Sequence, residues 1–134
     1  EHIIEQCAEF FYEAEQNYNI NGLFLASIGI HESNWGMSNI SKQKNNLFGY
    51  GSYDSTPFSS SYNFESYQYG IDLVAKVLAK YYLNEPGTAI FDNEVAVGSY
   101  YNGPTIAGVN VRYASDTNWS NRVYSIMESL YREL

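Results

Sequence analysis

The sequence is poor in cysteine, in basic residues and in long apolar runs. Its single cysteine, Cys7, excludes an internal disulfide. Seven Lys and Arg stand scattered against fifteen Asp and Glu, for a formal net charge of −8 at pH 7. Nucleic acids are bound by clustered basic side chains, so no nucleic acid partner is expected. The longest apolar stretch, residues 22–30, is too short to span a bilayer, so no membrane partner is expected either.

The sequence also lacks an initiator methionine and a signal-peptide pattern. We therefore expect residues 1–134 to be one domain excised from a larger precursor, a length that is ordinary for a single domain. Two His and one Cys are too few for a closed zinc site, and His31-Glu32 has no second His four positions on. No metal and no cofactor is expected.

Aromatic residues are abundant, with 14 Tyr, 7 Phe and 2 Trp. Tyrosine combines an apolar face with a polar tip, which suits wet, carbohydrate-like surfaces as well as half-buried positions. An AT-rich genome would favour the same composition, so both interpretations stay open.

The apolar periodicity predicts a mostly helical chain. A helix begins after Asn21, a suitable N-cap, and ends near residues 34–36; it is apolar almost all round and therefore belongs in the centre of the core. Residues 37–63 show no helical period and predict loops with a short hairpin. The remaining elements are predicted as helices over 2–18, 69–82 and 93–101, a brief strand over 108–112, and a last helix beginning near Ser115 or Asp116.

Glu32, in the segment HESNWGMS of residues 31–38, is the candidate acid. It falls at the end of the central helix, where apolar neighbours and the negative end of the helix dipole both favour a protonated carboxyl. A general acid working near neutral pH needs that form. On position alone, a solvated glutamate at a helix end is the commoner outcome.

Three segments in order resemble the motifs of the family-73 glycoside hydrolases. These are glucosaminidases of bacteria and phages, related to mannosyl-glycoprotein endo-β-N-acetylglucosaminidases. The family pattern is a Glu-Ser pair ending the core helix, then Gly and Ser, then Asn-Leu-Phe-Gly, and later Tyr-Ala-Ser/Thr-Asp. The matching positions here are Glu32-Ser33, Gly36 and Ser38, Asn46-Leu47-Phe48-Gly49, and Tyr113-Ala114-Ser115-Asp116. The resemblance covers nearly the whole chain.

The resemblance implies an α+β, mostly α, lysozyme-like fold with a small β-like lobe forming one wall of a substrate groove. It also implies that Glu32 protonates the departing glycosidic oxygen and that Tyr113 lines the sugar cleft. The substrate-binding candidates are Ser33, Trp35, Asn46, Phe48, Gly49, Tyr100 and Tyr101.

A second carboxylate is harder to assign. Glycosidases usually use two, and the insert offers Asp54 in a loop and Glu65 near the third helix. We favour Asp54; Asp116 is interpreted as a helix N-cap. If neither acidic residue of the insert reaches the bond, the N-acetyl group or a hydroxyl of the substrate itself is the alternative.

The expected activity is cleavage of β-1,4 bonds in the glycan strand of bacterial peptidoglycan, as an endo-β-N-acetylglucosaminidase of autolysin or endolysin type. A lytic transglycosylase or muramidase on the same fold, and a non-catalytic glycan-binding or phage-tail module, are the alternatives. The resemblance further implies a secreted, wall-located or virion-associated protein with cell-wall-binding modules elsewhere in the parent chain.

Overall fold

A computed structural model describes residues 3–51 and 60–133. Its elements are α1 (Ile3–Gln6), α2 (Ala8–Tyr18), α3 (Gly22–Ser33), α4 (Asn39–Lys44), α6 (Tyr67–Val77), the π-helical turn η1 (Leu78–Tyr82), α7 (Ile106–Tyr113) and α8 (Trp119–Arg132). Between these described residues the β-structure amounts to one isolated bridge, Ala89 to Val95. The mostly helical fold is confirmed, while the β-like lobe stays a prediction. None of the described helices is long and apolar enough to cross a membrane.

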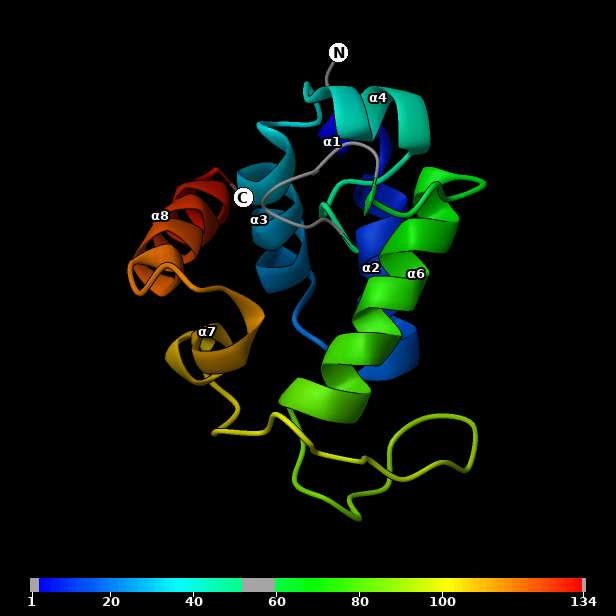
Figure 1. Ribbon diagram of the computed structural model, residues 1–134, viewed down its shortest axis with the longest axis vertical. Coiled ribbons are helices and arrows are strands. Elements are labelled where there is room, and N and C mark those ends of the chain that lie inside the picture. The colour runs from blue at the N-terminus through cyan, green and yellow to red at the C-terminus, as the bar shows by residue number, and fades with distance from the viewer. Residues whose placement is uncertain (1–2, 52–59, 134) are drawn as a thin grey trace.

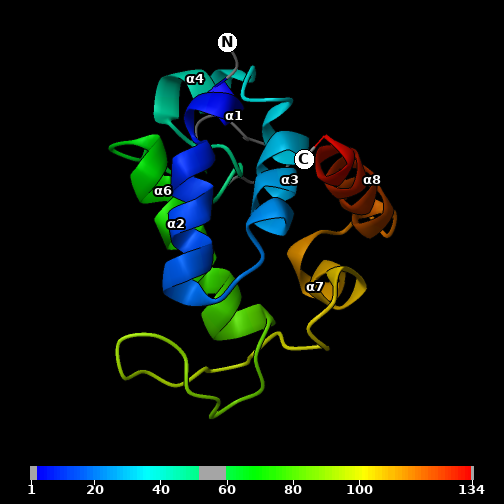
Figure 2. The same cartoon turned by 180° about the vertical axis from the view of Figure 1, so that it is seen from behind.

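The central helix of the fold is α3, as its composition predicted. Asn21 caps it, since its side-chain oxygen accepts from the backbone N–H of Phe24 at 3.0 Å. Leu25 and Ile28 have no exposed surface, and Ile30 has almost none. The helix packs against α2 on one side and α8 on the other, as Figures 1 and 2 show from opposite faces. Its C-terminal end is therefore carried by a rigid, fully packed element.

The first predicted helix is divided in two. Cys7 has φ −93° and ψ 1°, outside the helical region, and separates α1 from α2. The apolar face of α2 packs against α6 as well as α3, and Figure 2 shows α2 nearest the viewer. The apolar periodicity therefore predicted a helical segment correctly, but it did not predict the break at Cys7.

The chain leaves α3 through an unusual left-handed turn. Asn34, Trp35 and Gly36 all have positive φ, at 53°, 60° and 80°. The turn leads into α4, which the sequence interpretation missed. Ser38 caps α4 by accepting from the N–H of Ser41. This signal was present in the sequence, but only six residues follow it, five of them polar, so they show no apolar period.

The predicted helix over 69–82 is two elements. Ser66 caps α6 through the N–H of Tyr69, and the chain then widens into η1, where Leu83 N–H donates to the carbonyl of Leu78 at 2.9 Å. This five-residue spacing defines a π-turn, which turns the residues after it relative to a regular α-helix. Tyr82, at the end of η1, takes its direction from that turn.

Two predictions in the second half are wrong. Residues 93–101 are not helical: Val97 and Gly98 donate to the carbonyl of Lys80, and Gly98 has φ 66°. The predicted strand over 108–112 is part of α7, because Thr105 caps a helix there by accepting from Gly108 N–H at 3.0 Å. Figure 1 shows the long connection that runs beneath the bundle before α7. The last helix, α8, begins at Trp119, not at Ser115 or Asp116.

Candidate active site

A groove with a volume of about 660 Å³ opens at the C-terminal end of α3. Its walls come from α3, from the loop after α4, from η1 and from the connection between α7 and α8. The described residues that line it are His31, Glu32, Ile40, Phe48, Gly49, Tyr50, Gly51, Tyr82, Tyr113, Ala114, Ser115, Asp116 and Trp119. Two of the three sequence motifs thus meet the end of the central helix at one place.

Glu32 lies in this groove on the last turn of α3. Its Oε2 accepts a hydrogen bond from the indole Nε1 of Trp119 at 2.8 Å. Trp119 is 2% exposed and belongs to the core, whereas Glu32 is exposed. The surroundings of Glu32 are therefore mixed, with one buried N–H donor and open groove, and not the wholly apolar niche that the sequence suggested.

Tyr113 is half-buried beside this pair. Its ring lies 5.1 Å from that of Trp119 and 5.6 Å from that of Tyr82, measured between centroids. Burial, and after it the charge of Glu32, raise the pKa of the Tyr113 phenol far above its usual value. Tyr113 is therefore held in its neutral form, which leaves its O–H available as a hydrogen-bond donor.

Two more tyrosines of the groove have phenol groups with a raised pKa. Burial is the main cause that raises the pKa of Tyr50 and of Tyr82, and both residues line the groove. Neutral phenols present flat apolar faces together with O–H donors, a combination that matches the C–H faces and hydroxyls of a sugar.

Asn46 organises the loop that carries Phe48, Gly49 and Tyr50. It is 1% exposed, and its side chain makes four hydrogen bonds to backbone. Its amide donates to the carbonyls of Tyr50 and Tyr62 at 3.1 and 2.9 Å, and its oxygen accepts from the N–H groups of Phe48 and Tyr50, both at 3.1 Å. Asn46 thus shapes the loop, and Phe48 and Gly49 present its groove surface, Gly49 with φ 59°.

Asp116 is a second carboxylate of the groove. The backbone N–H of Asn118 donates to its Oδ1 at 2.9 Å, and Arg122 pairs with its Oδ2. The Asn118 N–H and then the Arg122 charge hold the pKa of Asp116 below its usual value. Asp116 therefore fixes the turn before α8 without being its N-cap, which is Asn118. Asp54, the favoured second acid, lies outside the described residues.

Besides the buried Asn46, four other predicted binding residues are not part of the groove lining. Ser33 is buried, donating to the Gly29 carbonyl at 2.6 Å and accepting from Gly36 N–H at 2.8 Å. Trp35 is 42% exposed in the turn after α3. Tyr100 lies beyond the rim, with its ring 5.2 Å from that of Tyr82, and Tyr101 follows it.

The structure adds Trp119 and Tyr82 to the site, neither of which the sequence analysis named as a site residue. A buried tryptophan needs a partner for its N–H, which is the one signal that pointed to Trp119. Tyr82 had no such signal, because its direction depends on the π-turn.

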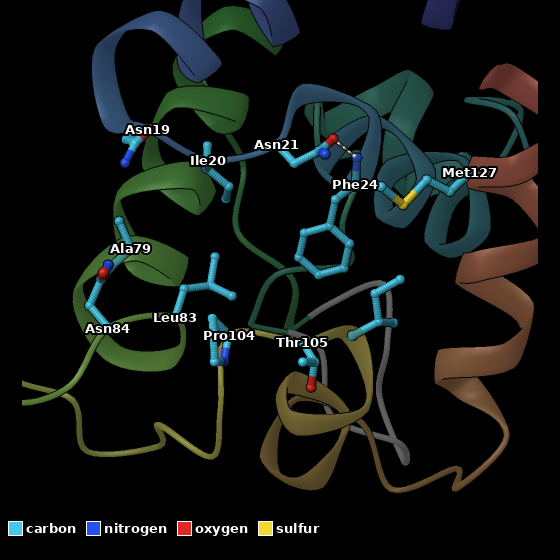
Figure 3. A pocket seen from close by; sticks show the side chains of 11 residues that line it. Asn19, Ile20, Asn21, Phe24, Ala79, Leu83, Asn84, Pro104, Thr105 and Met127 are labelled. Atoms are coloured by element: carbon cyan, nitrogen blue, oxygen red, sulfur yellow. Dashed lines mark hydrogen bonds between the residues drawn. The ribbon is translucent and has the colours of Figure 1, made fainter.

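A second cavity, of about 620 Å³, lies at the opposite end of α3 (Figure 3). Its lining is apolar with uncharged amides, including Phe24, Leu83 and Met127 beside Asn19, Asn21 and Asn84. None of the residues that line it is ionisable, so it offers no group for acid catalysis. Within residues 3–51 and 60–133, no three His, Cys, Asp or Glu side chains converge as metal ligands do.

A helical frame that places a glutamate at one end of a buried helix, in a groove lined by neutral phenols, is an arrangement that suits a glycoside hydrolase, which needs a positioned carboxyl group. Comparison with known proteins gives the family. The model of the glucosaminidase family, described as mannosyl-glycoprotein endo-beta-N-acetylglucosaminidase, matches residues 8–132. The chain belongs to this family.

Relatives and solved structures agree with this assignment. Two Streptococcus pneumoniae proteins to which endo-beta-N-acetylglucosaminidase activity is attributed are each 35% identical over 132 residues, which cover 98% of the chain but only 18% and 17% of those proteins. The chain thus spans less than a fifth of their length. The catalytic domain of the Listeria monocytogenes autolysin Auto superposes with a TM-score of 0.65 at 19% identity, covering 96% of this chain and 82% of that one. S. aureus Autolysin E superposes with a TM-score of 0.61 at 24% identity, covering 93% and 58%. These similarities establish the fold.

Proposed function

We propose that this domain hydrolyses the β-1,4 glycosidic bond on the GlcNAc side of the peptidoglycan glycan strand. The observation that carries the proposal is Glu32, which lies in the groove and accepts the indole N–H of a buried tryptophan. The family match and the autolysin structures support a wall polysaccharide as substrate, and one S. aureus Autolysin E structure is a complex with the muropeptide NAM-L-Ala-D-iGlu.

Glu32 acts as general acid in this proposal. It passes its proton to the glycosidic oxygen as the bond breaks and an oxocarbenium-like centre develops on the sugar. The carboxylate that remains is already paired with Trp119 Nε1–H, so the negative charge appears where a donor is in place. Tyr113, with its proton retained, donates a hydrogen bond to the sugar beside the reacting bond.

The other half of the reaction needs a nucleophile or a base. Asp116 is poorly suited, because Asn118 N–H and Arg122 engage its two oxygens. We assign the role to Asp54, with the substrate's own N-acetyl group as the alternative. Asn46, Phe48 and Gly49 position the sugar from the loop side, and Tyr100, Tyr101 and Trp35 extend the binding surface beyond the groove.

The test replaces Glu32 by Gln, which keeps the size and the hydrogen-bonding oxygen but removes the proton. We expect turnover to fall by at least about 100-fold, since general acid catalysis contributes on that scale. Glu128→Gln, on the exposed side of α8 and paired with Arg132, is the matched control and should leave turnover unchanged. An unchanged rate for Glu32→Gln contradicts the assignment.

Mass spectrometry of digested wall separates the reaction types. New reducing GlcNAc ends support the glucosaminidase proposal. Anhydro ends identify a lytic transglycosylase, reducing MurNAc ends a muramidase, and no new ends a binding module. We further propose that the domain acts at the cell wall within a longer protein, since its relatives are more than five times its length.

A further inference from the structure

Arg112 stands immediately before Tyr113, at the end of α7. Its guanidinium carbon lies 5.5 Å from the centre of the Tyr100 ring, which places the charge over the ring. The Arg112 charge also acts on Tyr82, which lines the groove. Burial raises the pKa of the Tyr82 phenol, and the positive charge of Arg112 partly opposes this rise. Arg112 and Tyr100 therefore lie one ring beyond Tyr82, at the edge of the candidate active site.

The Tyr100 side of this pair is held in place by backbone hydrogen bonds. Tyr100 N–H donates to the carbonyl of Tyr81, and Gly98 N–H to that of Lys80, both at 2.9 Å. The ring is 40% exposed and lies against Tyr82. The platform is thus formed before any ligand arrives, which lowers the entropic cost of binding.

Arg112 differs in its charge environment from four of the other basic residues. Lys76, Lys80, Arg122 and Arg132 each pair with a carboxylate. Arg112 makes no ion pair with any carboxylate among the residues that the structure describes, and it is exposed. The groove beside it carries the carboxylates of Glu32 and Asp116. Arg112 is therefore a positive charge at the end of an otherwise acidic groove.

We propose that Arg112, stacked on Tyr100, binds a carboxylate of the lactyl-peptide substituent on the strand. This inference rests on the proposed function, because that substituent is what sets peptidoglycan apart from neutral glycans of the same backbone. A guanidinium presents paired N–H donors that match a carboxylate, and the ring beneath holds it in position. The subsite gives preference for substituted strands and sets which sugar occupies the outer end of the groove.

The experiment measures the Kd of soluble strand fragments by calorimetry in the Glu32→Gln background, so that binding is read without cleavage. Three ligands are compared: strands with free stem-peptide carboxylates, the same strands with those carboxylates converted to amides, and peptide-free strands that keep the lactyl carboxylate. Arg112→Gln is added to the background. Arg132→Gln removes the same charge at the far end of α8, about 20 Å along that helix from Trp119, and is the control.

We expect Arg112→Gln to weaken binding of carboxylate-bearing strands about fivefold and to leave amidated strands unchanged. Amidation should weaken the Arg112 protein by the same factor and the Arg112→Gln protein not at all. In peptide-bearing strands the lactyl carboxyl is an amide, so binding of the peptide-free strand shows whether the subsite also accepts a free lactyl carboxylate in place of a stem carboxylate. An equal loss on charged and amidated strands, or no loss on either, overturns the proposal. Failure of the proposed function shows separately, as absence of new ends from wild-type digestion.

Discussion

Trp119 and Glu32 are 87 positions apart in the sequence, yet one hydrogen bond joins the core to the groove. The indole is buried because its ring belongs to the apolar core, and its N–H therefore needs an acceptor. Glu32 supplies that acceptor at the end of α3. Because both partners sit on packed helices, the direction of the Glu32 carboxylate is fixed by the fold and not by the substrate.

Tyr113 gives a pH test at the residue scale. Burial and the Glu32 charge raise its pKa, so the folded protein holds the phenol proton more tightly than a free tyrosine, and no ionisation occurs between pH 5 and 9. We expect Tyr113→Phe to lower kcat/KM about tenfold, the scale of one lost hydrogen bond, by the same factor at every pH in this range.

The measurement is a pair of pH–rate profiles, with Tyr12→Phe, at an exposed position of α2, as control. If Tyr113 worked as an ionised base, the deficit of the Phe variant would grow as the pH rises. A growing deficit would contradict the donor role.

Glu32, Tyr113 and the Asn46 loop were predicted because they lie in short motifs that resemble those of the family, and the structure places Glu32, Tyr113 and the Phe48-Gly49 part of that loop at the groove. Asn46 needs only its neighbours within four positions and Tyr62 to form its hydrogen bonds. The sequence analysis did not predict Trp119 and Tyr82 as site residues, because their places in the groove depend on contacts between elements that are far apart in the sequence. Ser33 was read as a binding residue, and its hydroxyl is instead used within the turn after α3.

Gly108 decides how α7 packs, at the element scale. A Cβ there would lie 2.2 Å from the carbonyl oxygen of Asn102 and 2.8 Å from that of Gly103, both backbone atoms. We expect Gly108→Ala to destabilise the fold by about 1–3 kcal/mol, as overpacking does, and to move α7 away from the loop that carries Tyr100.

Thermal unfolding measures this effect, with Gly29→Ala as the matched helical control. A Cβ at Gly29 would meet nothing closer than 3.6 Å, and alanine favours the helix, so its melting temperature should stay level or rise. A Gly108→Ala protein that melts at the wild-type temperature would contradict the packing argument.

The same helix shows the limit of pattern reading for elements. Val109 and Val111 beside Gly108 favour a strand by propensity, and only the Thr105 cap and tertiary packing make the segment helical. Residues 93–101 were predicted as a helix and are not one, because most of their backbone hydrogen bonds go to Lys80, Tyr81 and residues 87–91. The bond within the segment runs from Tyr101 N–H to the Gly98 carbonyl. The long apolar helices α3 and α6 were found because burial and periodicity agree in them.

The net charge of −8 sets a condition at the scale of the whole molecule. An anionic wall polymer is repelled at long range, and the screening length falls from about 30 Å at 0.01 M salt to about 8 Å at 0.15 M. We expect the KM of the isolated domain for anionic strands to fall about threefold over this range with little change in kcat. The contact at Arg112 acts over a few ångströms and is screened less.

Strands with amidated carboxylates provide the control for this titration, since their KM should not respond to salt. A KM that rises with salt for the anionic strand would mean that local attraction outweighs the repulsion by the molecule as a whole.

The direction of the Tyr82 side chain depends on the number of residues in the π-turn η1. The π-turn at residues 78–82 contains one residue more than a regular α-helical turn. Because each residue of an α-helix advances the chain by about 100°, this extra residue changes the direction of the side chains that follow. Deleting a single residue from this turn would preserve nearly every side chain of the domain and still rotate the ring out of the row that joins Tyr113 to Tyr100. Homologous chains that differ by one residue at this point would therefore carry the same tyrosines and bind different lengths of glycan.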